Sequence, residues 1–484
     1  MSERVGRDGA RIAVVGGGIA GLAAAVRLRD RLPADTRITV YEQSGTLGGK
    51  LRTGSLAGST VEFGAEAFLV RDPAGGDSAA VALARRVGLG DALVHPATGR
   101  AALAIGGELR PIPPGTLVGV PGDLAAVTTV ARPEAERDHD GGRPLLGPDE
   151  DVTVGDLVRR RLGAEVVDRL VDPMLGGVYA GRADELSLAA TMPALARAAR
   201  NESTLRGAVR AAQAATPRSP GAPVFATVTG GVSRLVAAAA EASGAEIRLN
   251  AAVRELIPVP GGWRLVVGPT RDPELVEVDA VVLALPARPA ARLLAGVDVA
   301  VGALVGRLDY ASVALVSLAL PATAADLLPT GLSGFLVPPG EGTLVKAATF
   351  FTTKWAHLRR ADGTVLVRAS VGRYGEEHLL QCSDDELVST VHRELGALVV
   401  GAAGDGARLP VPVASHVQRW GGALPQYTPG HLDRVAAARA ALREAYPSLA
   451  LAGAGYDGVG IPICVRSGET AAEEIIEVWG ASRA

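Results

Sequence analysis

The chain has 484 residues, of which 48% are hydrophobic and 21% are charged. This length exceeds one ordinary domain and predicts about two or three. The net charge of -3 gives no overall attraction for nucleic acid, so we expect no nucleic-acid partner. The two cysteines, Cys382 and Cys464, form no Cys-x-x-Cys pair, which indicates a reducing compartment and two core thiols.

The N-terminal residues lack the charged-then-apolar pattern of a secretory signal, and no apolar run reaches the roughly 18 residues of a membrane span. These features predict a cytoplasmic protein. The Arg-bearing stretch 186–215 has the apolar periodicity of helices. Such periodicity is more typical of a face packed on a core, although it leaves a weak association with a membrane surface open.

The first predicted elements form a strand, a turn and a helix. Residues 12–15 are typical of a fully buried strand, and Gly16 and Gly18 allow a tight turn close to a pyrophosphate. Gly21 lets the following helix, which runs through Leu32, pack on the strand. The N-terminus of that helix would face the anion.

A second strand at 37–41 ends at Glu42, about 20 residues after the last glycine, where an acidic group binds a ribose hydroxyl. The order of strand, turn, helix, strand and acid predicts a dinucleotide site. Two further glycine-bearing segments, 47–53 and 62–66, follow closely. They suit a long cofactor that needs more backbone donors than the first turn supplies, which favours FAD over NAD.

The middle of the chain is divided by two loops. Residues 131–150 and 216–223 are rich in Pro, Gly and charged residues, which predicts exposed loops with a mostly helical segment between them. The pattern of the first domain then resumes, with a helix predicted at 232–243 and strands at 247–249, 263–267, 275–278 and 280–285.

The remaining elements predict a second domain inserted into the first, followed by the last part of the first domain. Strands at 312–320 and 364–371 and a helix at 384–399 indicate a second, substrate-facing domain. A last strand at 450–451 leads through a glycine-rich turn to a helix at 467–477. The predicted fold is α/β: a Rossmann-type FAD-binding domain assembled from discontinuous segments, with an inserted α+β substrate domain and a mostly helical subdomain. The expected bounds are 1–90, 223–285 and 428–484 for the FAD-binding parts, 91–222 for the helical substrate or membrane-associated subdomain, and 286–427 for the substrate domain.

The sequence contains no nucleophile elbow, no His-Glu-x-x-His and no cluster of metal ligands, so no metal is expected. A flavin carries out hydride transfer by itself, and the protein has only to orient it and to provide a pocket of the right shape. No catalytic side chain is therefore singled out by this pattern.

Several motifs in order resemble the FAD-dependent protoporphyrinogen and coproporphyrinogen oxidases, within the larger monoamine-oxidase and phytoene-desaturase superfamily. The resemblance runs through most of the chain. It is carried by Glu62-Phe63-Gly64-Ala65-Glu66-Ala67-Phe68-Leu69 with Arg71, and by segments 159–163, 171–181, 354–357, Trp420 with 425–431, and 455–462.

This resemblance implies FAD contacts and two substrate candidates. Arg71 and Lys354 would bind propionate groups of the substrate, because each lies inside a family-like motif. The implied FAD contacts are Gly16, Gly17, Gly18, Ile19, Ala20, Gly21, Glu42, Gln43, Lys50, Gly64, Ala65, Glu66, Ala67, Val253, Trp420, Val459, Gly460 and Ile461.

The implied activity belongs to heme biosynthesis. Similar enzymes remove hydride from the bridging carbons of a porphyrinogen, and molecular oxygen reoxidises the flavin to give hydrogen peroxide. The Ala-, Arg- and Gly-rich composition resembles that of actinobacterial members, so we expect coproporphyrinogen III to be oxidised ahead of protoporphyrinogen IX. Protoporphyrinogen oxidation, an amine oxidase or desaturase activity, and a flavin-free carrier on the same fold are the alternatives, and contact with other heme-pathway enzymes stays open.

Overall fold

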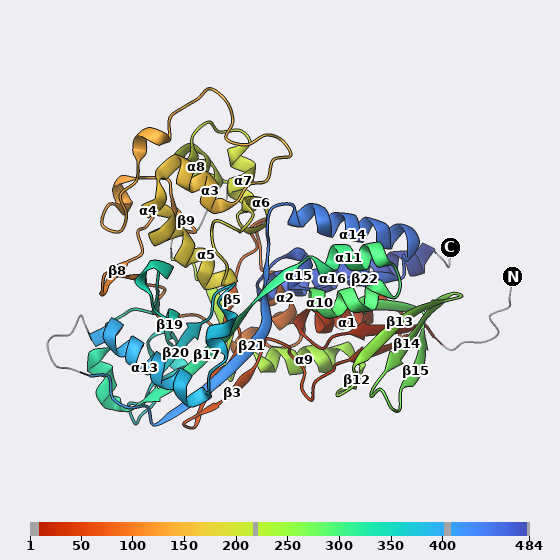
Figure 1. Ribbon diagram of the computed structural model, residues 1–484. Helices are drawn as coiled ribbons and strands as arrows, with labels where there is room; N and C mark the ends of the chain where they lie inside the picture. Colours follow the sequence, from red (N-terminus) through yellow and green to blue (C-terminus); the bar gives the residue numbers. More distant parts are fainter. Residues whose placement is uncertain (1–8, 216–220, 401–407, 482–484) are drawn as a thin grey trace.

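The computed structural model describes residues 9–215, 221–400 and 408–481, and it contains two large sheets (Figure 1). The first is a five-stranded parallel sheet in the order β12-β2-β1-β16-β22. Its strands come from three separate stretches of the chain, which confirms a Rossmann-type domain assembled from discontinuous segments. The strands are β1 (Arg11–Val15), β2 (Arg37–Tyr41), β12 (Glu246–Arg248), β16 (Ala280–Leu283) and β22 (Leu449–Leu451).

Helices cover this sheet because its central strands are buried on both faces. Ile12 and Val14 of β1 are almost fully buried, as are all residues of β16, which is why these strands are continuous apolar runs. On one side α1 (Ile19–Arg31) packs between α16 (Ile461–Ala481) and α9 (Ser233–Ser243). The last helix begins earlier than residue 467, where we expected it, because Pro462 is compatible with the first turn of a helix.

A small antiparallel sheet of β13 (Val253–Val259), β14 (Gly262–Val267) and β15 (Glu274–Val278) extends from the parallel sheet. Helices α10 (Ala287–Ala295), α11 (Val299–Gly306) and α14 (His431–Ala445) pack beside it. Figure 1 shows these elements and α1 on the side of the molecule away from α5 and β19.

The second large sheet has seven strands in the order β21-β17-β20-β19-β18-β7-β8. Helix α13 (Asp384–Val400) buries its apolar face against this sheet. Residues 101–111, which we expected in the mostly helical part, form its last two strands, with β18 and β7 paired in parallel. The strands are β7 (Ala101–Ile105), β8 (Glu108–Pro111), β17 (Asp309–Leu320), β18 (Gly334–Leu336), β19 (Val345–Phe350), β20 (Val365–Val371) and β21 (Ala414–Gln426).

The helical part has a separate apolar core, which includes one face of the 186–215 stretch. That face therefore packs on the protein interior. A π-helical turn at Val167–Val171 leads directly into α5. The helices are α3 (Val154–Leu162), α4 (Ala164–Val166), α5 (Asp172–Tyr179), α6 (Leu188–Thr191), α7 (Pro193–Ala199) and α8 (Leu205–Ala214).

The prediction that loop 131–150 is exposed is wrong at three positions, the first of which is Ala131 (1% exposed). Leu146 packs into the helical core, and Asp138 is 1% exposed. The Asp138 carboxylate accepts hydrogen bonds from the backbone N–H groups of Leu205 (2.7 Å) and Arg206 (3.1 Å) and so satisfies the N-terminus of α8. Of the second predicted loop, residues 216–220 lie outside the described residues.

Shorter elements complete the fold. Within residues 9–215, 221–400 and 408–481, no helix is both long and apolar enough to cross a membrane. The short elements are β3 (Thr53–Leu56), β4 (Ser59–Glu62), β5 (Phe68–Leu69), α2 (Ala79–Arg86), β6 (Leu93–Val94), β9 (Thr116–Leu117), β10 (Val120–Pro121), β11 (Phe225–Val228), α12 (Phe351–Lys354) and α15 (Ala454–Asp457).

Candidate active site

The glycines in the turn between β1 and α1 meet different structural requirements. Gly16 has φ +112°, and a Cβ there would collide with the carbonyl of Ala284. A Cβ on Gly21 would collide with the carbonyl of Gly16, so this glycine allows α1 to approach β1. Gly18 is extended (φ -74°), and a Cβ there would meet nothing within 4 Å. The space beside Gly18 is therefore the space that a pyrophosphate needs.

The N-terminus of α1 is suited to an anion. Gly18 is its N-cap residue, and no side chain caps the first backbone N–H groups. Gly18, Ile19 and Ala20 all line a cavity. Uncapped N–H groups and the positive end of the helix dipole together attract a phosphate.

Glu42 is held rigidly at the end of β2. Its Oε2 accepts a hydrogen bond from the backbone N–H of Gly17 (2.9 Å), and its Oε1 accepts one from Ser44 (2.8 Å). The backbone N–H of Ala251 donates to the Glu42 carbonyl (2.9 Å), which places Val253 nearby at the start of β13. Glu42 and Val253 line the same cavity, where the ribose and adenine of a dinucleotide would lie.

The cavity has a volume of about 1120 Å³ and extends from this turn to α5 and β19. It reaches the exposed side chains of Val178 and Phe225. Lys354 lines it, whereas Arg71 is exposed and does not. The lining includes all the FAD contacts expected from the sequence except Gly17 and Gly21, namely Gly16, Gly18, Ile19, Ala20, Glu42, Gln43, Lys50, Gly64, Ala65, Glu66, Ala67, Val253, Trp420, Val459, Gly460 and Ile461.

The second glycine segment lies against the first. The backbone N–H of Gly48 donates to the Gly17 carbonyl at 2.8 Å. Lys50 follows on the cavity wall, where burial lowers the pKa of its ammonium group. Cys464 lies close to it, and burial raises the pKa of this thiol to about 11, so the thiol is protonated near neutral pH.

The C-terminal glycine segment supplies the start of α16. Val459, Gly460 and Ile461 line the cavity, and Gly460 has φ +123°, a conformation that side chains rarely adopt. The N-terminus of this long helix therefore points its positive dipole end at the cavity. Such an end stabilises negative charge on a bound ring system.

Trp420 lies on β21 of the seven-stranded sheet. It lines the part of the cavity next to the glycine segments 16–21, 47–53 and 459–461, which we call the FAD cradle. Its indole N–H donates to the carbonyl of Phe63 at 2.9 Å. A Cβ on Gly64 would collide with the carbonyl of Lys50. Segment 62–66 is thus sandwiched between the glycine turn of the first sheet and a strand of the second.

Glu66 is the centre of a buried ion-pair network between the two sheets. Its carboxylate pairs with Lys354 Nζ on one oxygen and with Arg368 Nη2 (2.5 Å) on the other. Burial alone would raise the pKa of Glu66, but the Lys354 and Arg368 charges hold it below its usual value. Arg368 also donates to the carbonyls of Glu62 (3.0 Å) and Gly64 (2.8 Å).

Two residues of the cavity wall were not predicted from the sequence. Arg368 lies on β20, and no local pattern links it to Glu66, which is 302 residues away. Lys346 lies on β19 and also lines the cavity. A signal for Lys346 was present, because the chain has three lysines among its 49 basic residues.

Comparisons with known proteins agree with this geometry. Residues 19–476 match the family described as flavin containing amine oxidoreductase. The chain is 38% identical to the coproporphyrinogen III oxidase of Mycobacterium tuberculosis, over 97% of this chain and 98% of that protein. It is 29% identical to the coproporphyrinogen III oxidase of Bacillus subtilis, over 96% and 97%.

A crystal structure from Exiguobacterium sp. 255-15, assigned provisionally as a protoporphyrinogen oxidase, has a TM-score of 0.80 and 30% identity, and covers 98% of this chain and 100% of that chain. The cradle, with its open space at Gly18, its uncapped helix N-terminus and its fixed acid, fits FAD. The protein is an FAD-dependent oxidoreductase, and the chain belongs to the flavin containing amine oxidoreductase family.

Proposed function

We propose that the protein oxidises coproporphyrinogen III to coproporphyrin III in heme biosynthesis, with molecular oxygen as the electron acceptor. The observation that carries this proposal is the similarity to coproporphyrinogen III oxidases along nearly the whole chain. The cavity supports it, because it continues beyond the FAD cradle to a second region between α5 and the seven-stranded sheet.

Bound FAD supplies a hydride acceptor for the bridging carbons of the macrocycle and a route for the electrons to oxygen, which yields hydrogen peroxide. The chain supplies the orientation. The turn at Gly18 and the N-terminus of α1 would hold the pyrophosphate, and Glu42 would hold the ribose. Residues 64–67 and Trp420 bound the cavity between cradle and substrate region, and the N-terminus of α16 stabilises negative charge there.

The substrate region is bounded by apolar side chains. Met174 and Val178 of α5 and Phe335 and Leu336 of β18 line it. Such walls suit the flat, apolar faces of a tetrapyrrole and exclude water from its bridging carbons. Lys354, at the border with the cradle, is shared between Glu66 and an incoming propionate in this proposal.

Protoporphyrinogen IX oxidation is the second candidate, and the fold similarity to the Exiguobacterium structure favours it. The two substrates differ in their number of propionates, so cationic groups in the cavity decide between them. We place the reaction in the cytoplasm, with any contact to a membrane surface or to other heme-pathway enzymes being peripheral to it.

The test is a direct assay of the flavin-loaded protein with each porphyrinogen under air. We expect porphyrin fluorescence to appear with oxygen consumption and peroxide formation, and kcat/KM to be higher for coproporphyrinogen III. A clear preference for protoporphyrinogen IX would select the second candidate. Oxidation of amines with no reaction on either porphyrinogen would reject both.

A further inference from the structure

All three lysines of the chain, Lys50, Lys346 and Lys354, line the same cavity, the one that contains the Gly18 turn. Every other basic residue is an arginine. A lysine differs from an arginine in having a compact ammonium group on a flexible stem, which can lose its proton when buried. The chain therefore uses lysine only on the wall of this cavity.

Two of these lysines already have a place in the expected site. Lys50 belongs to the turn that forms the FAD cradle, and Lys354 is paired with Glu66. Lys346 has neither role. It is 4% exposed and lies on β19, at an irregularity in the pairing of β19 with β20.

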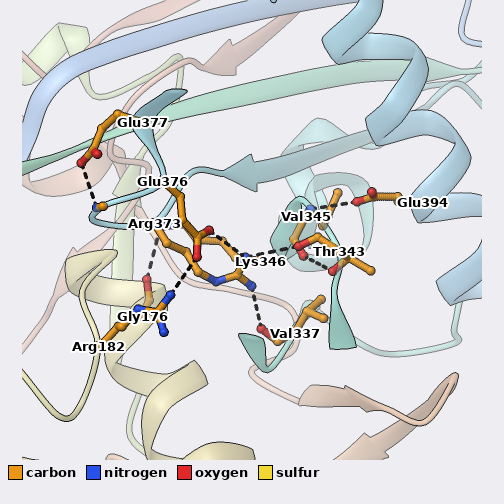
Figure 2. Close-up of polar contacts among 11 residues, drawn as sticks. Gly176, Arg182, Val337, Thr343, Val345, Lys346, Arg373, Glu376, Glu377 and Glu394 are labelled. Atoms are coloured by element: carbon orange, nitrogen blue, oxygen red, sulfur yellow. Dashed lines mark hydrogen bonds and ion pairs between the residues drawn. The ribbon is translucent and has the colours of Figure 1, made fainter. Parts of the chain in front are cut away.

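The Lys346 ammonium group lies where β19 meets α5. It donates to the carbonyl of Gly176 at 3.3 Å, and Gly177 next to it also lines the cavity. An ammonium group has three donors, and Gly176 is the one acceptor that the described residues provide. Figure 2 shows this lysine between Gly176 and the guanidinium group of Arg373.

The charge that acts on Lys346 is that of another cation, Arg373. Arg373 is 8% exposed and donates to the carbonyls of Val337 and Thr343, both at 3.3 Å. Burial, together with the Arg373 charge, lowers the pKa of Lys346 to about 7. A buried cation beside a like charge is costly unless an anion compensates it.

The carboxylates of this region act on other groups (Figure 2). They are bound to backbone N–H groups or to arginines, and Asp172, Glu376 and Glu394 act on the charge of Arg373. Glu376 accepts from Arg182 (2.9 Å) and lies 4.0 Å from Arg373, Asp172 accepts from the backbone of Ala183 (2.6 Å), Glu394 accepts from that of Val345 (2.9 Å), and Glu377 accepts from that of Gly375 (3.2 Å).

We propose that Lys346 is the carboxylate anchor of the substrate region, and that its ammonium group binds one propionate of the tetrapyrrole at the junction of β19 and α5. This inference rests on the proposed function, because it takes the substrate to be a porphyrinogen. The incoming carboxylate supplies the negative charge that the described residues do not provide for Lys346. It accepts hydrogen bonds from the ammonium N–H groups that do not donate to Gly176. Arg373 adds a second positive charge behind the ammonium group.

The test compares Lys346→Met and Lys346→Arg with the wild type, all loaded with FAD. Coproporphyrin III is the stable probe, and its tetramethyl ester is the uncharged counterpart. Arg393→Met is the matched control, because it removes one positive charge from an exposed position on α13. Binding is measured by porphyrin absorbance, together with flavin content, Tm, and kcat and KM for coproporphyrinogen III.

We expect Lys346→Met to weaken binding of coproporphyrin III about tenfold or more and to leave binding of the ester unchanged. KM should rise more than kcat falls, flavin content should stay normal, and Lys346→Arg should recover part of the affinity. Unchanged affinity for the free acid in Lys346→Met would overturn the proposed role of Lys346 and leave the proposed function standing. An equal loss for acid and ester with a lowered Tm would do the same. Failure of the wild type to bind coproporphyrin III would overturn the proposed function and the anchor with it.

Discussion

At the scale of single residues, the open space beside Gly18 gives a clean test of the cofactor site. The Gly18 backbone is extended and a Cβ would meet nothing, so Gly18→Val is compatible with the fold. Its side chain would occupy the place of the pyrophosphate. We expect the purified variant to lose nearly all flavin absorbance and to retain the Tm of wild-type protein stripped of FAD.

Gly16→Val is the informative companion variant. Gly16 has φ +112° and faces the Ala284 carbonyl, so this change should prevent folding whether or not FAD is present. Normal flavin content in Gly18→Val would show that the pyrophosphate does not bind at this turn.

Trp420 permits a second residue-scale prediction. It lines the cavity and is only partly buried, while its indole N–H bonds the Phe63 carbonyl. Trp420→Ala should therefore lower flavin content or turnover clearly, with a loss of stability below the roughly 3 to 5 kcal/mol typical of a fully buried Trp. Flavin content, turnover and the urea midpoint of one preparation separate the two effects. Normal flavin content and turnover would remove Trp420 from the site.

Lys346 also predicts a pH dependence. Its lowered pKa, about 7, means that the ammonium form dominates below that pH and the neutral amine above it. A carboxylate binds the charged form, so the Kd for coproporphyrin III should be lowest below pH 7 and should rise by up to about tenfold per pH unit above it. The charged and titratable groups around it are Arg373, Arg182, Asp172, Glu376, Glu377 and Glu394.

The Lys346→Arg variant controls for those neighbours, since an arginine stays charged throughout this range. Its Kd should be flat between pH 6 and 8.5. An equal slope in wild type and Lys346→Arg would assign the titration to another group.

At the scale of elements, the Glu66 network joins segment 62–66 to β20 and α12. Replacing Glu66 by Gln would leave Lys354 and Arg368 buried without their shared carboxylate. Breaking a buried ion pair on one side typically costs about 3 to 5 kcal/mol. We expect Glu66→Gln to lower the free energy of unfolding by that order, and Lys354→Met to cost less because Arg368 still balances Glu66. The reverse ranking in chemical denaturation would contradict this account.

The sequence predicted most of the helices and strands. It did not predict which of them come into contact. The continuous apolar run of β1 and the spacing from Gly21 to Glu42 predicted the first βαβ unit, because both patterns are local. Strands β7 and β8 were missed, because β7 is a short apolar run, β8 is a short edge strand, and neither shows a clear alternation of apolar and polar residues. Arg368 could not be predicted, because its function depends on a contact between the two sheets.

At the scale of the whole molecule, FAD should hold three distant stretches of chain together. The residues that we expect to contact it, near Gly18, near Val253 and near Ile461, line one cavity and come from separate segments. A ligand that binds only the folded state stabilises it by about 2.7 kcal/mol at a concentration of 100 Kd. FAD-stripped protein should therefore melt several degrees lower than the loaded form and recover on addition of FAD, and Gly18→Val should not respond. An equal Tm with and without FAD would show that the segments assemble independently of it.

The sequence by itself predicted a cofactor site, because a glycine turn, a helix N-terminus and an acid at fixed spacing are local features of one chain segment. It also determined the α/β class and, through motifs in order, the family. The tertiary structure decided where the cavity lies and which cations line it. Arg71 is exposed, Lys354 is paired with Glu66, and Lys346 lies in the wall without a carboxylate partner among the described residues. The physical reason is that the pairing of a buried charge depends on residues hundreds of positions apart, which only the folding of α5 against the seven-stranded sheet brings into contact.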